Sequence, residues 1–116
     1  MDKKTLEGLD WPVMCGALKD KCHTLRGQLR AVDGDFAENR RACLNRYDVI
    51  EELWRLDNEG EHPPISAVHD IEELSERARK GEVLEPHELV EVGNTLGALS
   101  RLERWVTERQ ERAPTL

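Results

Sequence analysis

The chain has 116 residues, the length of a single domain, and carries a formal net charge of −7 from 24 acidic and 17 basic side chains. This acidic balance disfavours a chain that grips nucleic acid on its own, because phosphate contacts need a basic surface. No apolar run approaches the roughly 18 residues of a membrane span. The N-terminal sequence MDKKTLEGLDW lacks the apolar centre of a secretion signal, so we expect a cytoplasmic protein without a membrane partner.

The first helical pattern runs over residues 11–32. Asp10 is a candidate N-cap, and Pro12 fits the first turn, where no intrahelical hydrogen bond is lost. Thr24 and Gly27 interrupt the pattern, and the sequence leaves open whether this region forms one helix or two. The apolar stripe comprises Met14, Leu18, Cys22, Leu25, Leu29 and Val32.

Residues 32–35 (VDGD) predict a turn, with Asp35 as a candidate cap for a helix that starts at Phe36. About six turns are expected, because apolar residues continue at helical spacing. The stripe of this helix comprises Cys43, Tyr47, Ile50 and Trp54.

A polar loop follows at residues 58–66 (NEGEHPPIS). A linker between two domains is one interpretation of it. Neither half of the chain carries enough apolar residues for a core of its own. We therefore prefer a loop within one helical domain that spans residues 1–116.

Two helix signals follow the loop. Asp70 is a candidate N-cap that forms a capping box with Glu73, and Gly81 is a candidate C-terminal stop after Lys80. The apolar face between them consists of Ile71, Leu74 and Ala78.

The last helix has the strongest start signal. Pro86 suits the first helical position, Glu88 stands three residues after Glu85, and Leu84 can pack on Leu89 as a hydrophobic staple. The spacing of its apolar residues is close to that of a coiled-coil seam. This seam comprises Leu89, Val92, Leu96, Leu99, Leu102 and Val106.

Gly93 and Gly97 lie along one edge of that seam, although each costs roughly 1 kcal/mol in a helix interior relative to alanine. Two interpretations stay open. The missing side chains let another helix approach closely and form a rigid strut, or the two glycines are simply tolerated.

No strand pattern runs beyond a few positions, so we predict an all-α fold. The expected architecture is a bundle of four to five helices with one long C-terminal amphipathic helix. The sequence has no P-loop, no GxSxG, no HExxH and no Asp-rich calcium loop, and its helical carboxylates are expected to be solvated. We therefore predict a chain that is not an enzyme and that neither binds nor hydrolyses ATP.

Metal and redox chemistry are not expected either. Cys15, Cys22 and Cys43 include no CxxC pair, which is typical of a reduced cytosolic chain. Only Cys22 and His23 place two ligand types side by side, and adjacent helical residues point about 100° apart. We predict no metal and no other cofactor.

Arginines concentrate in three segments, RRACLNR, ERARK and RLER. We favour their pairing with nearby glutamates at helical spacing over an exposed basic surface. The last segment adjoins the apolar seam, where we place a candidate interaction surface with Trp105 as its expected anchor. The alternative is that Phe36, Tyr47 and Trp54 cover the whole seam. The candidate surface comprises Leu96, Leu99, Arg101, Leu102, Arg104 and Trp105.

Three segments of the chain occur in a characteristic order. Thr5, Leu6 and Glu7 open it, and a turn of the form small-x-Thr-x-x-Gly follows, formed by Cys22, Thr24 and Gly27. The most specific segment runs over residues 65–106, with matches at Asp70, Ile71, Ala78, Gly81, Val83, Leu84, Pro86, Glu88, Leu89, Thr95 and Leu96. In this order the chain resembles the N-terminal core region of bacterial MutS-like proteins of the second type, which lack the mismatch-recognition domain and often carry an Smr nuclease domain.

The chain departs from that family pattern at two points. Glu85 stands where the family usually has Ser, Thr or Asp, and residues 31–35 (AVDGD) stand where a proline usually occurs. The ATPase, clamp and Smr nuclease of the family are also absent. The resemblance therefore implies a divergent member, a truncated form of one or a short stand-alone relative.

The resemblance implies a helical core or lever segment of a DNA-binding ATPase that acts on branched DNA and suppresses recombination. In some bacteria the family acts on stalled ribosomes, so the ribosome is a further candidate partner. We expect this chain to bind the rest of a parent MutS-like chain or a second copy of itself, and DNA only weakly, if at all. A stand-alone helical protein-interaction module is the alternative.

Overall fold

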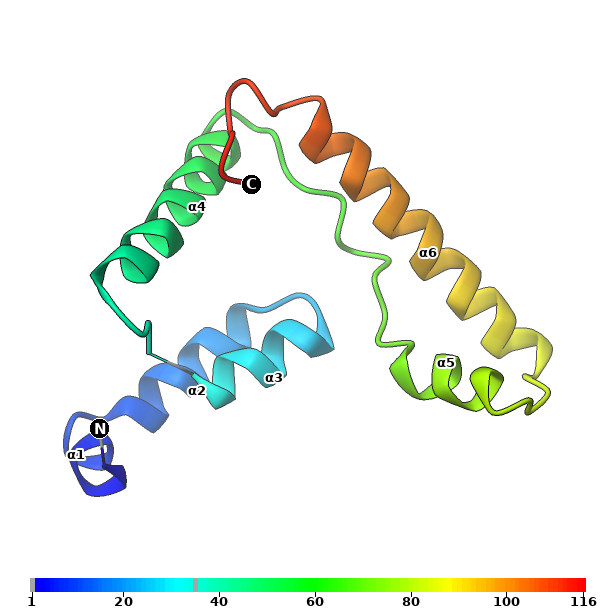
Figure 1. The fold of residues 1–116 in the computed structure, drawn as a ribbon, viewed down its shortest axis with the longest axis horizontal. Coiled ribbons are helices and arrows are strands. Elements are labelled where there is room, and N and C mark those ends of the chain that lie inside the picture. Colours follow the sequence, from blue (N-terminus) through cyan, green and yellow to red (C-terminus); the bar gives the residue numbers. More distant parts are fainter. Residues whose placement is uncertain (1, 35) are drawn as a thin grey trace.

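The computed structural model describes residues 2–34 and 36–116, and every regular element in them is an α-helix (Figure 1). The predicted all-α class is confirmed. The described helices outnumber the predicted four to five, because a short N-terminal helix forms and residues 11–33 divide into two. The helices are α1 (Lys3–Gly8), α2 (Trp11–Lys21), α3 (Leu25–Asp33), α4 (Arg40–Asn58), α5 (Glu72–Arg79) and α6 (Pro86–Thr107).

Thr24 is the residue that divides the first stripe into two helices. Its Oγ1 accepts a hydrogen bond from the Gly27 N–H at 3.1 Å and so caps the start of α3. A Cβ on Gly27 would lie 3.0 Å from that oxygen, so the tight cap favours glycine there. The question left open by the sequence is settled in favour of two helices.

Asp10 occupies the N-cap position of α2, but its side chain makes no capping hydrogen bond. Its backbone is left-handed, with φ of 54°, whereas a capping side chain normally extends from a β-region backbone. The predicted side-chain cap is therefore wrong. Pro12 does lie in the first turn, as predicted.

The third predicted helix starts later than expected. Asn39 Oδ1 accepts from the Ala42 N–H at 2.9 Å, so α4 begins at Arg40 and has about five turns. Phe36 precedes the helix and stacks on Trp11, with ring centroids 4.7 Å apart. The predicted start at Phe36 is therefore wrong, and the predicted cap at Asp35 lies outside the described residues.

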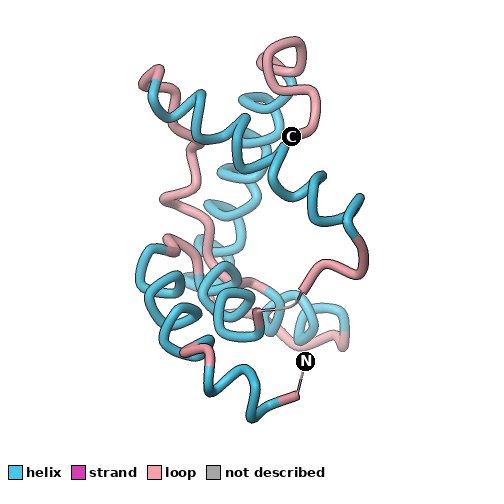
Figure 2. The backbone as a smooth tube through the Cα atoms, turned by 90° about the vertical axis from the view of Figure 1, so that its left-hand side faces the viewer, coloured by secondary structure: helices cyan, strands magenta, loops and turns pink. Residues whose placement is uncertain are grey.

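The helices are arranged openly. Substantial helix–helix packing joins only α1 to α2 and α2 to α3, among the described elements. Helices α4 and α6 form two arms that converge near the top of Figure 1, and the side view of Figure 2 shows the same open path. The radius of gyration is 17.5 Å, compared with about 13 Å for a compact domain of about 100 residues.

The buried residues of the described chain are few and mostly small. Cys15 and Ala31 lie between α2 and α3, Leu56 lies near the end of α4, and Thr95 and Ala98 lie on α6. Ala113 is buried in the C-terminal segment. Most large apolar side chains therefore remain at the surface, which makes their faces the features of interest for function.

Candidate interaction surface

The start of α6 follows the predicted chemistry. Pro86 is the first helical residue, and the Glu88 carboxylate accepts a hydrogen bond from the Glu85 N–H at 2.8 Å. The predicted capping box of Glu85 and Glu88 is confirmed. Glutamate thus serves here in place of a shorter capping residue.

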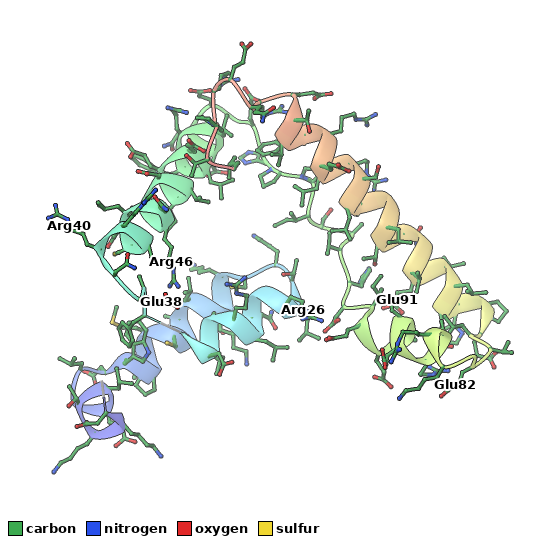
Figure 3. The ribbon with its side chains drawn as sticks, viewed as in Figure 1. Arg26, Glu38, Arg40, Arg46, Glu82 and Glu91 are labelled. Carbon is green, nitrogen blue, oxygen red and sulfur yellow. The ribbon has the colours of Figure 1, made fainter. Side chains whose placement is uncertain are left out.

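Helix α5 starts later than its predicted cap. Ile71 occupies the N-cap position, and Asp70 accepts a hydrogen bond from the Glu72 N–H at 3.1 Å. The predicted capping box of Asp70 with Glu73 is therefore wrong. The reason is tertiary, because Asp70 and Glu72 both pair with Arg26 of α3, which reaches toward α5 (Figure 3).

Gly81 ends α5 as predicted. Its φ of 86° is left-handed, its N–H donates to the Ala78 carbonyl at 3.0 Å, and the Glu82 N–H donates to the Arg77 carbonyl at 3.1 Å. These two hydrogen bonds form a Schellman motif, which a glycine in the left-handed region allows.

Arg77 joins α5 to the start of α6. Its Nε lies 3.0 Å from a carboxylate oxygen of Glu82 at the turn between the two helices, and its Nη1 lies 2.7 Å from a carboxylate oxygen of Glu88. The hydrogen bond from Arg77 lowers the pKa of Glu88. Arg79 pairs with Glu76 at 2.6 Å, so the favoured pairing of arginine with nearby glutamate is confirmed for this segment.

The apolar seam of α6 is only partly covered. The loop after α4 contacts this helix, since Thr95 Oγ1 accepts from the His69 N–H at 3.3 Å. Thr95 and Ala98 are buried, and Val92, Leu102 and Val106 are half-buried. The remaining seam residues stay exposed, and these are Leu89, Leu96 and Leu99.

Phe36, Tyr47 and Trp54 do not cover the α6 seam, so the alternative considered from the sequence is wrong. Tyr47 and Trp54 are both exposed, as is Phe36, and no extensive packing joins α4 to α6 in the described chain. The exposed part of the α6 seam is therefore available to another molecule or segment.

The six residues of the candidate surface fall into two sets. Leu96 and Leu99 are exposed, whereas Leu102 and Trp105 are half-buried. The Arg109 guanidinium lies over the Trp105 ring, 4.4 Å from its centroid. The ring of the expected anchor is thus already in contact with its own chain.

Arg101 and Arg104 form the basic part of the candidate surface. Both are exposed, and neither makes an ion pair with any described residue, so the favoured pairing with glutamate fails for this segment. The Arg101 guanidinium lies 3.4 Å from the position of a Cβ built on Gly97. It therefore covers the gap that this glycine leaves.

Gly93 faces open space. A Cβ built there would meet nothing within 4 Å, so no helix of the described chain approaches either glycine. Within the chain itself, the interpretation of a close-packed strut is wrong. Leu89 and Leu96 border the open notch at Gly93, one helical turn away on either side.

A polar corner, which the sequence did not predict, joins the ends of α4 and α6. Glu61 accepts hydrogen bonds from Arg109 and from Arg112, the latter at 2.6 Å, and Arg112 also pairs with Glu59. Arg109 is mostly buried, with 19% of its side chain exposed. We call this set the corner cluster.

The C-terminal segment closes the same corner. The Glu52 carboxylate of α4 accepts from the Thr115 N–H at 3.0 Å and from the Leu116 N–H at 3.1 Å. Arg55 donates to the Arg112 carbonyl. Each partner lies more than forty positions away in sequence, so no local spacing could have indicated these contacts.

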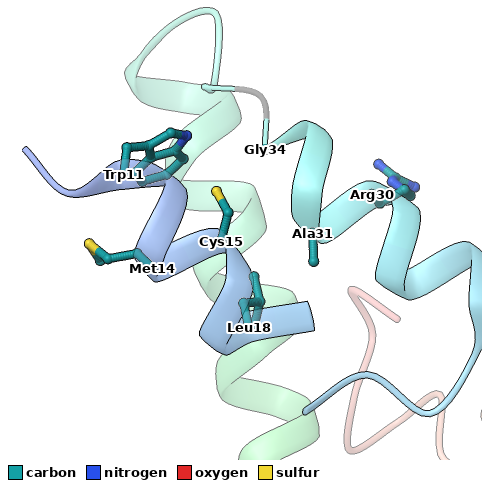
Figure 4. A pocket seen from close by; sticks show the side chains of 7 residues that line it. All are labelled: Trp11, Met14, Cys15, Leu18, Arg30, Ala31 and Gly34. Atoms are coloured by element: carbon teal, nitrogen blue, oxygen red, sulfur yellow. The ribbon is translucent and has the colours of Figure 1, made fainter. Parts of the chain in front are cut away.

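An apolar pocket of about 420 Å³ lies between α2 and α3 (Figure 4). Arg30 is the one charged residue that lines it. A Cβ on Gly34 would lie 3.0 Å from Cys15 Sγ, so glycine allows the close approach of the two helices. The lining consists of Trp11, Met14, Cys15, Leu18, Arg30, Ala31 and Gly34.

Neither a metal-binding group nor a membrane-spanning helix occurs among residues 2–34 and 36–116. No group of three or more His, Cys, Asp or Glu side chains has an arrangement that could hold a metal ion. No helix combines the length and apolar character needed to cross a lipid bilayer.

The described chain is an open set of α-helices in which apolar side chains of α6 remain exposed. Along its whole length the chain is 31% identical to Endonuclease MutS2 of Anaeromyxobacter sp., over 116 residues that make up 14% of that protein. Endonuclease MutS2 of Symbiobacterium thermophilum gives 31% identity over 120 residues, with 100% of this chain and 14% of the relative covered. That of Halothermothrix orenii gives 26% over 115 residues, with 93% and 14% covered.

The resemblance drawn from the sequence is confirmed, because the chain is similar along its whole length to a segment of these MutS2 proteins. It spans 14% of the length of the curated relatives it matches. No family model matches the chain, and no solved structure is significantly similar to it.

Proposed function

We propose that the chain is a non-catalytic helical core or lever segment of a MutS2-like DNA-binding ATPase, which acts on branched DNA and suppresses recombination. The observation that carries this proposal is the match of the whole chain to proteins named Endonuclease MutS2. The open arrangement of helices supports a structural role, because arms that share no core suit a connecting element.

The exposed face of α6 is the proposed contact with the rest of a MutS2-like protein. Leu89, Leu96 and Leu99 lie exposed on this helix, and the notch at Gly93 has room for the backbone of a neighbouring helix. An apolar face of this kind is typical of an interaction site when it stays uncovered.

A reconstitution experiment tests the contact. The chain is mixed with Symbiobacterium MutS2 from which the matching segment has been removed, and sedimentation velocity measures complex formation. We expect a one-to-one complex that binds a four-way DNA junction, whereas the chain alone binds the junction weakly or not at all because of its acidic surface. Tight junction binding by the chain alone would contradict the proposed structural role.

Matched variants locate the contact on α6. Leu96→Asp should abolish the complex, because it places a charge in an apolar contact. Val83→Asp serves as the control, since Val83 is 91% exposed and lies before the helix. Absence of a complex with the native chain, or equal binding by both variants, would refute the α6 contact.

The non-catalytic part of the proposal has its own test. The isolated chain should show no saturable binding of labelled ATP at micromolar concentration and no ATP hydrolysis, because it lacks the loop of backbone N–H groups and lysine that holds phosphates. Saturable binding would refute this part alone.

A further inference from the structure

Helix α4 carries a second unpartnered apolar face, which is independent of the α6 contact. Leu44, Tyr47, Ile50 and Trp54 are 49%, 64%, 59% and 67% exposed, and their spacing of three or four residues places them on one side of the helix. No described helix packs extensively along α4. The buried Leu56 lies on the opposite side, at the corner cluster.

The charges of α4 run against its helix dipole. The first half carries Arg40, Arg41 and Arg46, and the second half carries four acidic residues, Asp48, Glu51, Glu52 and Asp57, against one basic residue, Arg55. Cations near a helix N-terminus and anions near its C-terminus are unfavourable for an isolated helix. The gradient becomes favourable when a second copy of the same helix runs antiparallel beside it, since basic and acidic halves then face each other.

The apolar stripe has the register that such a pairing needs. Arg40, Cys43, Tyr47, Ile50, Trp54 and Asp57 recur at alternating steps of three and four, which is the spacing of a coiled-coil seam. The pattern is symmetric about the midpoint between Tyr47 and Ile50. A two-fold axis there brings Tyr47 against Ile50, Cys43 against Trp54, and Arg40 against Asp57, each pair formed twice.

The two ends of the stripe are open to this contact. Arg40 points away from the fold at the start of α4 (Figure 3). Asp57 is 61% exposed, and its Oδ1 lies 2.5 Å from His62 Nδ1, which leaves its second oxygen for a partner. A pocket of about 260 Å³ lies at the same end of α4, and its lining consists of Glu51, Trp54, Arg55, Asn58 and Glu59.

We propose that α4 pairs antiparallel with α4 of a second copy of the chain, through Tyr47, Ile50 and Trp54 and the reciprocal contacts of Arg40 with Asp57. This contact rests on α4 alone, so it stands or falls separately from the contact proposed for α6.

Sedimentation equilibrium over a hundredfold concentration range tests the pairing. The native chain should rise from monomer to dimer mass, and Trp54→Ala should raise the dissociation constant by about tenfold or more. The substituted side chain is mostly exposed, so circular dichroism should show an unchanged helix content. Leu96→Ala on α6 is the control and should dimerise as the native chain does. A constant monomer mass for the native chain would overturn the proposal.

Charge reversal tests the direction and register of the helices. Arg40→Asp and Asp57→Arg should each weaken the dimer, because each places like charges opposite each other, and the double variant should restore it. A double variant that stays as weak as the single ones would overturn the antiparallel register. If the chain is monomeric and Trp54→Ala abolishes binding to the MutS2 remainder, the face belongs to that protein and the proposal is wrong.

Discussion

The guanidinium of Arg77 in α5 holds the carboxylate of Glu88 in the first turn of α6, with Nη1 2.7 Å from Oε1 and Nη2 3.4 Å from Oε2. The same carboxylate accepts the hydrogen bond of the Glu85 N–H. One side chain therefore both caps α6 and fixes α5 to it.

This double role predicts a loss of stability in acid. Arg77 lowers the pKa of Glu88 from its usual 4.5, so the ionised carboxylate stabilises the fold fully above that value. The contribution is lost as the pH falls through the lowered pKa. Urea unfolding followed by circular dichroism between pH 3 and 6 should show a smaller acid-induced loss in Glu88→Gln than in the native chain. Glu73→Gln, which changes a glutamate of α5, is the control. If the free energy of unfolding changed with pH equally in all three chains, Glu88 would not be the source of the acid-induced loss.

Gly93→Ala should stabilise the isolated chain. Nothing lies within 4 Å of the added methyl group, and alanine is preferred to glycine in a helix interior by roughly 1 kcal/mol. Gly81→Ala should have the opposite sign, because φ of 86° strains any residue with a Cβ. Thermal unfolding measures both. A decrease in stability for Gly93→Ala would show that the notch is filled in solution.

Thr24→Ala should destabilise the α2–α3 hairpin by about 1 kcal/mol, because the Gly27 N–H loses its capping oxygen. Thr24→Ser retains the hydroxyl and should unfold close to the native midpoint. Chemical unfolding monitored by circular dichroism compares the three chains. Equal midpoints for all of them would mean that the cap contributes nothing to the hairpin.

Arg109→Ala should loosen the corner cluster by about 1–2 kcal/mol, because it removes both the contact with Glu61 and the cation over the Trp105 ring. Hydrogen exchange should show reduced protection in the last turn of α6 and in the residues after it. Arg104→Ala, five positions earlier and without an ion pair to the described residues, is the control. If protection from hydrogen exchange were unchanged in Arg109→Ala, the corner cluster would not contribute to the stability of this region.

Features that depend on a few neighbouring residues could be predicted from the sequence. The start of α6 at Pro86 and Glu88 and the end of α5 at Gly81 each depend on partners within about five positions. The local sequence is therefore enough to predict them. The predictions failed where a distant group decided the outcome. Arg26 forms an ion pair with Asp70, which lies 44 positions later in the sequence. Phe36 stacks on the Trp11 ring and lies before α4, although its apolar character had indicated a place in that helix.

The candidate surface shows the same limit. The leucine stripe of α6 indicated an apolar face correctly, but it could not tell which part would be covered. The buried positions are the small residues Thr95 and Ala98, which contribute little to a hydrophobic pattern, while Leu96 between them stays exposed. The corner cluster was missed for a related reason, since Glu61 and Arg109 are ordinary surface charges until the fold brings them together.

The corner cluster also sets how the two arms can move. Interdigitated side chains fix an angle between helices, whereas guanidinium–carboxylate pairs allow rotation while they stay in contact, and dissolved salt screens them. The angle between α4 and α6 should therefore open and close like a joint as ionic strength changes, while each helix keeps its own hydrogen bonds. Any change in that angle should be centred on the residues of the corner cluster, Glu59, Glu61, Arg109 and Arg112.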